Sequence, residues 1–451
     1  MVLFLPFSSH ALTSQTTRNA IQGSAPYLTF DGGRTRAVDA NGLLGITLSD
    51  GTRYTPSTNS SSSSRPIVLP VEGQSFADIG MLVPTNTNSV ALSSLIGPPY
   101  NYWGDDDGDS VVSATGSLSL SIVDKNNRPV SRDTVLTTCT DSAPYEVTLS
   151  STDGTLSTRY GFPNRSTFRE SSVTYYVNPK AEPVVCFARP NLLAGKLGDW
   201  PHDPSADFAG PSSMWDPANG FIPQSTGPSS YGRNFPTTGA NGLYFDLLIG
   251  GVSQPLFWSP VSLGGITVTM SNSTATSVRV TLTGPYATES QRNSSSPSPL
   301  STISLPQTFE LVGRDSNGTP VVKYGFTLKQ WFVNRGSKLD NYSNTVSWCN
   351  SLGYRVPKVK DLTNASRDWY YNPISIGASP SSSSRYYMRH IGSGFFTEWG
   401  KMDDYSGVGF INSWYWTSDP DGSAQFFVGT YYGHVDSLYT HYGIHGLCSH
   451  P

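Results

Sequence analysis

The sequence predicts a mostly β protein in which tandem β-sandwich (Ig-like) units are followed by a smaller α+β domain. Charged residues make up only 14% of the chain, whereas Gly and Pro are abundant at 43 and 33 residues. Short stretches of alternating apolar and polar residues recur, and each is typical of a strand with one buried face. Polar turns separate these stretches, which favours sandwiches joined by loops.

The first residues of the chain predict export. Residues 1–7 are apolar, and the Ser-Ser-His-Ala segment that follows ends in the small residue Ala11. Such a pattern is typical of the end of a signal peptide and its cleavage site. We therefore interpret residues 1–11 as a residual signal peptide and expect an exported protein, secreted or at the cell surface. An apolar tail without a targeting role is the alternative.

Charge and hydropathy exclude two kinds of interaction. The chain has 29 Lys and Arg against 33 Asp and Glu, and its net charge is only -4. Nucleic-acid binding requires a dense basic surface, which this composition does not provide. We also find no run of about 18 apolar residues, so we expect no helix that spans a membrane.

Alternation with period two predicts strands within residues 117–122, 266–270 and 278–282, each with a Ser/Thr-rich exposed face. Residues 145–162 and 309–326 also match without a gap. Each begins with an aromatic residue, a Glu and an apolar residue, and continues through an Asp-Gly-Thr or Asn-Gly-Thr turn. Each ends with a basic residue followed by Tyr-Gly-Phe. We interpret the match as two related sandwich units; the alternative is that any two hairpins with Asx-Gly turns look alike.

We expect sandwich units at residues 12–190 and 191–336, followed by the C-terminal domain at 337–451. Residues 190–236 are rich in Pro, Gly and Trp and have little periodicity. They form either a junction between domains or a long irregular loop on a sandwich. The serine-rich stretch 379–384 is too polar to bury and is expected to be an exposed loop.

Four cysteines in a chain expected to be exported predict two disulfides. Three pairings are possible. Sequence order favours Cys139 with Cys186 and Cys349 with Cys448, because each pair then stays inside one predicted domain. A zinc site is excluded, since the sequence has no C-x-x-C and no histidine at ligand spacing from a cysteine.

The C-terminal domain begins with a helical pattern. Val346, Cys349 and Leu352 recur at helical spacing, Ser343 is expected to cap the helix and Gly353 to end it. Strands rich in aromatic residues follow, and the last of them contains the final cysteine.

Three segments of this domain read Trp-Cys-Asn-Ser-Leu-Gly-Tyr-Arg-Val-Pro at 348–357, Tyr-Trp-Thr-Ser at 415–418 and Leu-Cys at 447–448. Together they resemble the C-type-lectin-like fold. In that fold a cysteine of the first helix bonds to one in the last strand, which implies a bond between Cys349 and Cys448. The Glu-Pro-Asn and Trp-Asn-Asp signatures of calcium-dependent sugar binding are absent.

Four upstream segments read YLTFD at 27–31, GITLSDGT at 45–52, YNYWGDDDGD at 100–109 and TGANGLYFD at 238–246. They resemble the adhesion domain of enterobacterial invasin E and its relatives in the invasin/intimin group. The resemblance implies a bacterial cell-surface adhesin whose lectin-like domain binds a receptor, glycan or protein, on a host or neighbouring cell. A secreted carbohydrate-active enzyme and a structural subunit of a surface fibre are the alternatives.

The densest acidic cluster is a candidate calcium site. Asp105, Asp107 and Asp109 alternate in one segment and can offer carboxylate oxygens to calcium from a loop. The spacing is not that of an EF-hand, because Gly116 stands where that loop requires Glu. A solvated acidic turn is the alternative, and we expect no other cofactor.

Aromatic residues near the C-terminus predict the binding surface. They are more numerous than a domain of this size buries, and Tyr and Trp lose little conformational entropy on binding. We predict that the ligand is bound by Trp414, Tyr431, Tyr432, His434, Tyr439 and His441. The alternative is that these side chains form the core of the lectin-like domain.

The sequence contains no hydrolase motif such as G-x-S-x-G or H-E-x-x-H. We therefore predict a protein without enzymatic activity. Glycoside cleavage requires a pair of carboxylates, and the best candidates for such a pair are Glu398 and either Asp403 or Asp404.

Overall fold

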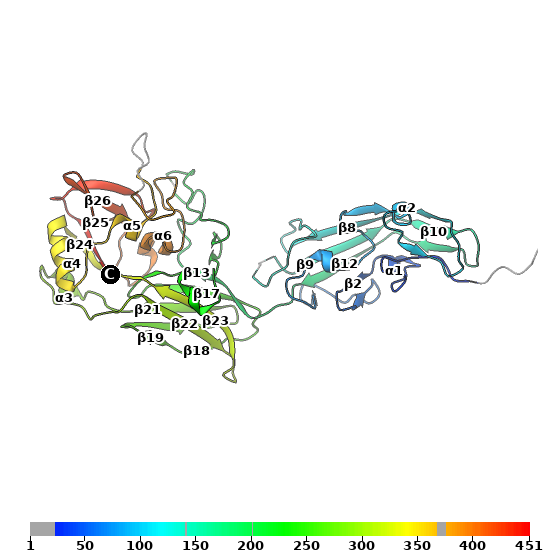
Figure 1. Ribbon diagram of the computed structural model, residues 1–451, viewed down its shortest axis with the longest axis horizontal. Coiled ribbons are helices and arrows are strands. Elements are labelled where there is room, and N and C mark those ends of the chain that lie inside the picture. Colours follow the sequence, from blue (N-terminus) through cyan, green and yellow to red (C-terminus); the bar gives the residue numbers. More distant parts are fainter. Residues whose placement is uncertain (1–22, 140–141, 201, 368–375) are drawn as a thin grey trace, which may run out of the picture. The chain divides into compact units, whose positions relative to one another are not determined.

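The computed structural model describes residues 23–139, 142–200, 202–367 and 376–451, and it is mostly β, as the sequence predicts (Figure 1). The chain groups into two compact units that meet in the sequence between Ala181 and Glu182. The predicted signal peptide lies outside the described residues. Across the four described ranges, no helix has the length and apolar character needed to cross a membrane.

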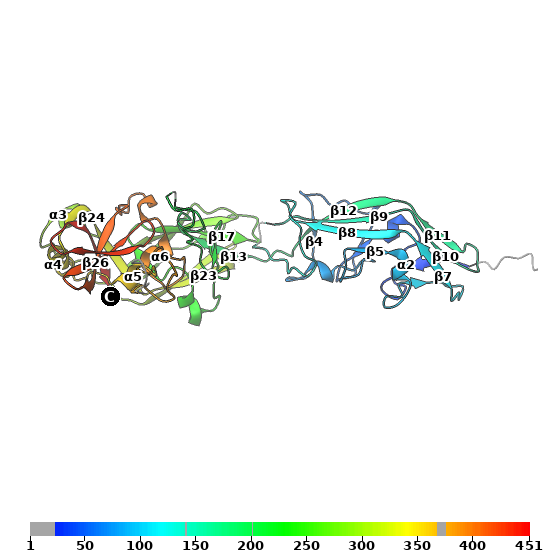
Figure 2. The same cartoon turned by 90° about the horizontal axis from the view of Figure 1, so that it is seen from above.

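The first unit is a β-sandwich. Its larger sheet has the order β4-β12-β9-β8-β5 (Figure 2) and its smaller one the order β11-β10-β7. In β8 the residues Leu118, Leu120 and Ile122 are buried and the serines between them face outward, as the alternation predicts. The strands of these two sheets are β4 (Ile67–Val68), β5 (Ser89–Ala91), β7 (Val112–Thr115), β8 (Ser117–Val123), β9 (Tyr145–Ser151), β10 (Gly154–Thr158), β11 (Arg165–Phe168) and β12 (Ser171–Asn178).

Short elements complete this unit. The strands pair as β1 with β6 and β2 with β3. Their bounds are β1 (Tyr27–Leu28), α1 (Ala40–Leu43), β2 (Ile46–Thr47), β3 (Arg53–Tyr54), η1 (Phe76–Asp78), α2 (Leu92–Leu95) and β6 (Trp103–Gly104).

The second unit contains a second sandwich, with sheet orders β14-β15-β13-β17-β21-β20-β19 and β18-β22-β23. Strand β13 pairs with β17 and so belongs to the second unit, whereas we expected residues up to 190 to belong to the first sandwich unit. The elements are β13 (Val184–Arg189), β14 (Trp215–Asp216), β15 (Gly220–Phe221), η2 (Pro228–Arg233), β17 (Tyr244–Gly250), β18 (Phe257–Trp258), β19 (Val261–Leu263), β20 (Ile266–Ser271), β21 (Ser277–Thr283), α3 (Glu289–Asn293), β22 (Gln307–Arg314) and β23 (Pro320–Leu328).

A third sheet with the order β16-β24-β28-β25-β26-β27 forms the C-terminal part, and helix α5 packs against α6 and β26. These elements are β16 (Thr238–Ala240), β24 (Gln330–Asp340), α4 (Tyr342–Leu352), α5 (Val359–Leu362), α6 (Phe395–Trp399), η3 (Met402–Asp404), β25 (Trp414–Asp421), β26 (Ala424–Gly429), β27 (Val435–Tyr439) and β28 (Ile444–His450). The helix α4 and the last strand β28 lie where the sequence predicts a helix and a final strand, whereas β16 and β24 of this sheet precede the helix.

The disulfide between α4 and β28 agrees with the sequence prediction. Cys349 of α4 is bonded to Cys448 of β28 with a Cα–Cα distance of 5.4 Å, which confirms this pair. Cys139 and Cys186 are disulfide-bonded as well, and none of the cysteines is free.

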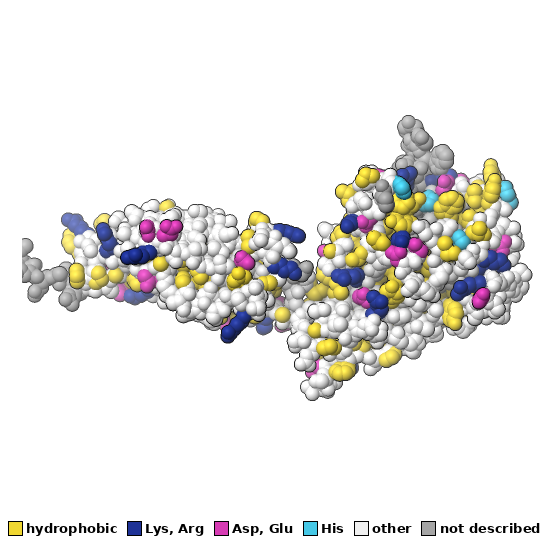
Figure 3. Space-filling view, turned by 180° about the vertical axis from the view of Figure 1, so that it is seen from behind, with side chains coloured by type: hydrophobic (Ala, Val, Ile, Leu, Met, Phe, Trp, Pro, Cys, Tyr) yellow, Lys and Arg dark blue, Asp and Glu magenta, His cyan; other side chains and the backbone are white. Residues whose placement is uncertain are grey.

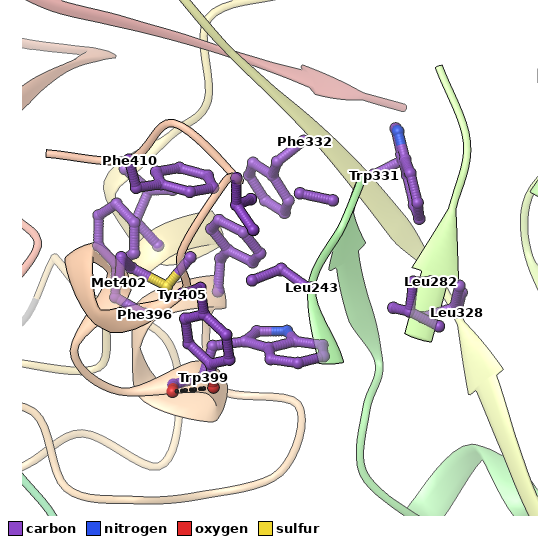
Figure 4. Close-up of a cluster of buried hydrophobic side chains, with 14 of the residues drawn as sticks. Leu243, Leu282, Leu328, Trp331, Phe332, Phe396, Trp399, Met402, Tyr405 and Phe410 are labelled. Atoms are coloured by element: carbon purple, nitrogen blue, oxygen red, sulfur yellow. Dashed lines mark hydrogen bonds between the residues drawn. The ribbon is translucent and has the colours of Figure 1, made fainter. Parts of the chain in front are cut away.

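The residues predicted as a second sandwich and as a separate C-terminal domain share one hydrophobic core. Leu243 and Leu282 of the sandwich lie in one cluster with Phe332 and Trp399 of the C-terminal part (Figure 4). Strand β16, which precedes the sandwich strand β17, pairs in parallel with β24 and so joins the third sheet. The predicted boundary after residue 336 falls inside β24, because a pairing between distant segments leaves no local sequence pattern.

The matching segments 145–162 and 309–326 do not form equivalent structures. The second is a hairpin, since β22 pairs directly with β23. In the first, β9 pairs with β8 and β12, whereas β10 pairs with β7 and β11 in the other sheet. The interpretation as a structural repeat is therefore wrong, because strand partners are chosen by tertiary packing and not by the turn sequence alone.

Candidate ligand-binding surface

The turn between β26 and β27 presents two adjacent half-buried tyrosines, Tyr431 and Tyr432. The amide of Gly433 donates to the carbonyl of Gly429 at 3.0 Å, which closes the turn. Gly433 has a φ of 70°, and a side chain there would collide with the ring of Tyr387. Glycine therefore lets this turn fold tightly against the core and fixes the position of both tyrosines.

Trp200 reaches this turn from a distant part of the sequence. Its ring centroid lies 4.9 Å from that of Tyr431 and 4.6 Å from that of Tyr432, and Tyr432 stacks on His434 at 4.7 Å. Trp414, which is 46% exposed, has its ring centroid 6.5 Å from that of His434. We call these five residues the aromatic patch. Figure 3 shows histidine and hydrophobic side chains side by side on the surface of the second unit.

His434 is held neutral within the patch. Burial lowers its pKa to about 4, with nearby Asp436 opposing the shift and Arg385 adding to it. Its Nδ1 is buried and has no hydrogen-bond partner. The imidazole therefore acts as a packing surface under Tyr432 at neutral pH.

The other two predicted ligand residues lie apart from the patch. Tyr439 ends β27 with 57% of its surface exposed, and it stacks on His441 with ring centroids 6.0 Å apart. His441 in turn contacts Tyr442 at 4.3 Å, and Tyr442 is 50% exposed. We call Tyr439, His441 and Tyr442 the tip cluster. It is a second exposed aromatic surface of the same sheet.

A polar groove of about 820 Å³ is lined by two loops, residues 203–209 and 382–388. It borders the aromatic patch, because Tyr386 in its wall has its ring centroid 5.5 Å from that of Tyr432. The amide of Asp203 also donates to the carbonyl of Trp200 at 3.0 Å. This bond therefore links the indole of the patch to the residue that places a carboxylate in the groove.

Hydrogen bonds fix the polar groups of the groove. Asp203 accepts from the Tyr386 hydroxyl at 2.6 Å and from the Ser205 hydroxyl at 2.6 Å. Arg385 donates to the same tyrosine hydroxyl at 2.7 Å and lies 3.6 Å from Asp203. The bonds from Ser205 and Tyr386 lower the pKa of Asp203, so the carboxylate is ionised at neutral pH.

The acidic loop does not gather its carboxylates. The Asp109 side chain accepts from the amide of Tyr160 at 2.8 Å, whereas that of Asp105 accepts from the amide of Asp107 at 3.2 Å. One carboxylate oxygen of Asp105 and one of Asp107 are buried without a partner. Within the described part of the chain, no three His, Cys, Asp or Glu side chains are arranged to hold a metal ion. Calcium binding at this loop stays a prediction.

Glu398 does not form a catalytic pair. Its carboxylate is fully buried and accepts hydrogen bonds from the amides and hydroxyls of Thr237 and Thr238 and from the amide of Gly392. Burial raises the pKa of Glu398, while these bonds oppose the shift. Asp403 and Asp404 are engaged instead by Lys401, the former at 3.3 Å. The contacts of Glu398 are therefore structural.

Sequence reasoning missed four residues at this surface, namely Trp200, Asp203, Arg385 and Tyr386. They lie in two segments that showed only Pro, Gly, Ser and Trp enrichment, without periodicity. The one available signal was Trp200 itself, because an aromatic residue in a polar loop favours recognition. Nothing local indicated that the two loops meet.

No family model and no curated protein matches the chain. Among solved structures it is similar to invasin, described as a bacterial integrin-binding protein, with 13% identity and a TM-score of 0.35 over 80% of this chain and 54% of that one. The chain thus spans about half the length of that structure.

The chain is also similar to intimin. A C-terminal 282-residue fragment of intimin, in complex with the translocated intimin receptor, matches at 10% identity and a TM-score of 0.32 over 76% of this chain and 100% of that one. An intimin mutant of EHEC O157:H7 matches at 11% identity and a TM-score of 0.28, over 49% of this chain and 93% of the other. These are the two kinds of protein that the sequence segments resemble. The likeness is distant.

Proposed function

We propose that this chain is an exported bacterial cell-surface adhesin that binds a receptor on a host or neighbouring cell through the aromatic patch, with the tip cluster as a second contact. The observation that carries the proposal is the convergence of Trp200, Tyr431 and Tyr432 from two distant segments into one half-exposed aromatic surface. Aromatic side chains at a surface offer large contact areas for little entropy loss.

The support beneath the patch favours recognition. The turn that carries the tyrosines is closed by a backbone bond and packs against the buried Tyr387. Side chains held in one conformation before binding lose less entropy when the complex forms. A surface of this kind holds a ligand without the paired titratable groups that turnover would require.

The covalent structure is consistent with an exterior location. All four cysteines are disulfide-bonded, and disulfides persist in oxidising compartments. We therefore place the protein outside the cytoplasm, at the cell surface or in the medium.

Attachment of beads coated with the full chain to a panel of animal and bacterial cells tests the proposal. Tyr431→Ala and Trp414→Ala are expected to weaken attachment roughly thirtyfold each, the effect of removing an aromatic anchor worth about 2 kcal/mol. Tyr439→Ala tests the tip cluster in the same assay.

Tyr160→Ala is the matched control, since Tyr160 is also an exposed tyrosine, 55% accessible, but lies in the first unit. It should attach as well as the parent chain. Melting temperatures of all variants are measured in parallel. The proposal fails if no cell type binds the parent chain above the level of uncoated beads. It also fails if the patch variants bind normally per folded molecule.

A further inference from the structure

The polar groove has the size of a binding site for a small organic ligand. Its volume of about 820 Å³ lies within the range of ligand pockets. Its walls come from two segments that are joined by a hydrogen bond, which the backbone amide of Arg389 donates to the carbonyl of Phe208 at 2.9 Å. The groove is therefore a feature of the folded second unit, held by backbone contacts on both sides.

The lining suits a ligand that both donates and accepts hydrogen bonds. Asp203 and Asp207 supply carboxylate acceptors, Arg385 supplies donors, and Ser205 and Ser383 supply hydroxyls that do both. An apolar ligand would displace water from these polar groups without replacing its hydrogen bonds, at a cost of desolvation. A ligand with several hydroxyl groups replaces the water that they bind.

The charge of the groove argues against an anionic ligand. Two carboxylates face one guanidinium, which leaves one net negative charge. A second hollow of about 650 Å³ in the same unit has the opposite character, because Arg292, Arg335 and Lys338 face only Glu289 in its lining. The two hollows therefore differ in the charge of the ligand that each would favour.

The aromatic patch supplies the other half of a sugar site. A pyranose ring has an apolar face of C–H groups that packs on aromatic rings, while its hydroxyls point outward from the ring edge. Here Tyr386 lies in the groove wall and contacts Tyr432, which contacts Trp200. A ligand longer than one sugar can place its hydroxyls in the groove and stack a ring on the patch.

We propose that the polar groove binds a neutral oligosaccharide, with the aromatic patch as its stacking platform. This inference rests on the proposed adhesin function and names the receptor's chemical class. The side chains of Asp207 and Arg385 contact the sugar hydroxyls, and Asp203 positions Arg385 and Tyr386. The receptor on the cell is thereby recognised through its uncharged glycan.

The full chain is tested on an array of neutral oligosaccharides and of the same oligosaccharides carrying a sialyl or sulfate group. The neutral set is expected to bind, and the charged set more weakly. Asp207→Asn keeps the acceptor for the Ala209 amide, which lies 2.9 Å from Asp207 Oδ1, so the loop is preserved. It should weaken neutral-sugar binding roughly tenfold, the loss of one charge-assisted hydrogen bond. Arg385→Gln is expected to act in the same direction.

Arg292→Gln, in the second hollow, is the matched control and should leave neutral-sugar binding unchanged. Binding of charged glycans alone, abolished by Arg292→Gln, would overturn the inference. So would cell attachment that survives removal of cell-surface glycans and is lost on protease treatment; that result leaves the adhesin proposal intact and assigns a protein receptor. If the parent chain attached to no cell type but still bound neutral sugars on the array, the adhesin function would be refuted, and sugar binding by the groove would be supported.

Discussion

At the scale of single residues, His434 shows how burial converts a titratable group into a packing group. The ring stacks on Tyr432 and lies below a surface that is open to solvent. Its Nδ1 finds no partner in this position. The buried Nδ1 without a partner destabilises the fold. The flat neutral ring nevertheless supports the patch by stacking on Tyr432.

This burial predicts a pH dependence. Because the folded pKa of about 4 lies below the ordinary value of 6.5, the unfolded chain binds more protons between these pH values. The free energy of unfolding should fall as the pH is lowered through that window, by on the order of 3 kcal/mol from this group. Urea unfolding at several pH values measures the slope.

His434→Gln is expected to flatten the slope in that window, whereas His441→Gln, at an exposed histidine, should retain it. Equal slopes in the parent chain and the His434→Gln variant would contradict the assignment.

At the scale of elements, a short helix is anchored by one carboxylate. Helix α6 spans only Phe395–Trp399, and an isolated helix of this length is not stable in water. Glu398 ties it to β16 and the preceding residue, since its two oxygens accept from five donors on Thr237, Thr238 and Gly392. The burial of α6 against the third sheet therefore depends on a side chain with no exposed surface.

Glu398→Gln should destabilise the second unit by about 3 kcal/mol, because the amide turns a donor toward groups that are donors themselves. Denaturant unfolding measures the loss. Glu289→Gln, at an exposed position in α3, is the control and is expected to change stability by less than about 0.5 kcal/mol. A Glu398→Gln variant as stable as this control would show that the hydrogen bonds of Glu398 contribute little.

Helix α4 shows how far local sequence predicts structure. Its apolar spacing and its end at Gly353, which has a φ of 83°, were predictable from the residues themselves. The start was wrong by two residues: Asn341, not Ser343, caps the helix, by accepting from the amide of Asn344 at 2.9 Å. Both residue types are good caps, so the residue types alone do not decide between the two positions.

The candidate site was predictable only in part. Tyr431, Tyr432, His434 and Trp414 could be named because aromatic residues among glycines stand out in the sequence. Their partner Trp200 could not, since the contact joins segments that lie more than half of the second unit apart along the chain. The groove likewise depends on two irregular loops, and irregular loops carry no periodicity from which a meeting point follows.

At the scale of the whole molecule, the shared core predicts where the chain can be cut. A fragment 337–451 loses Trp331, Phe332 and Val333, all buried in β24, together with strand β16. It should not fold, in contrast to the expectation of a separate C-terminal domain. A fragment 182–451 with Cys186→Ser retains the complete core and should unfold in one cooperative transition. Circular dichroism melting of both fragments decides between the two divisions of the chain.

A cooperative melt of the 337–451 fragment would show that the third sheet is stable without β16 and the sandwich. Absence of folding in both fragments would show that the second unit requires the first. Each result assigns a different minimal folding unit.

Strand β23 ends at Leu328 in a sheet of the sandwich, and β24 begins at Gln330 in the third sheet, so that Lys329 alone joins them. A flexible connection of several residues would first extend when the bound surface is pulled away, before it transmitted any force. Here a tensile force applied at the patch passes from one sheet to the other without free chain to extend. The second unit should therefore respond to load as a stiff body, and the hydrogen bonds between β16 and β24 will share that force with the covalent chain.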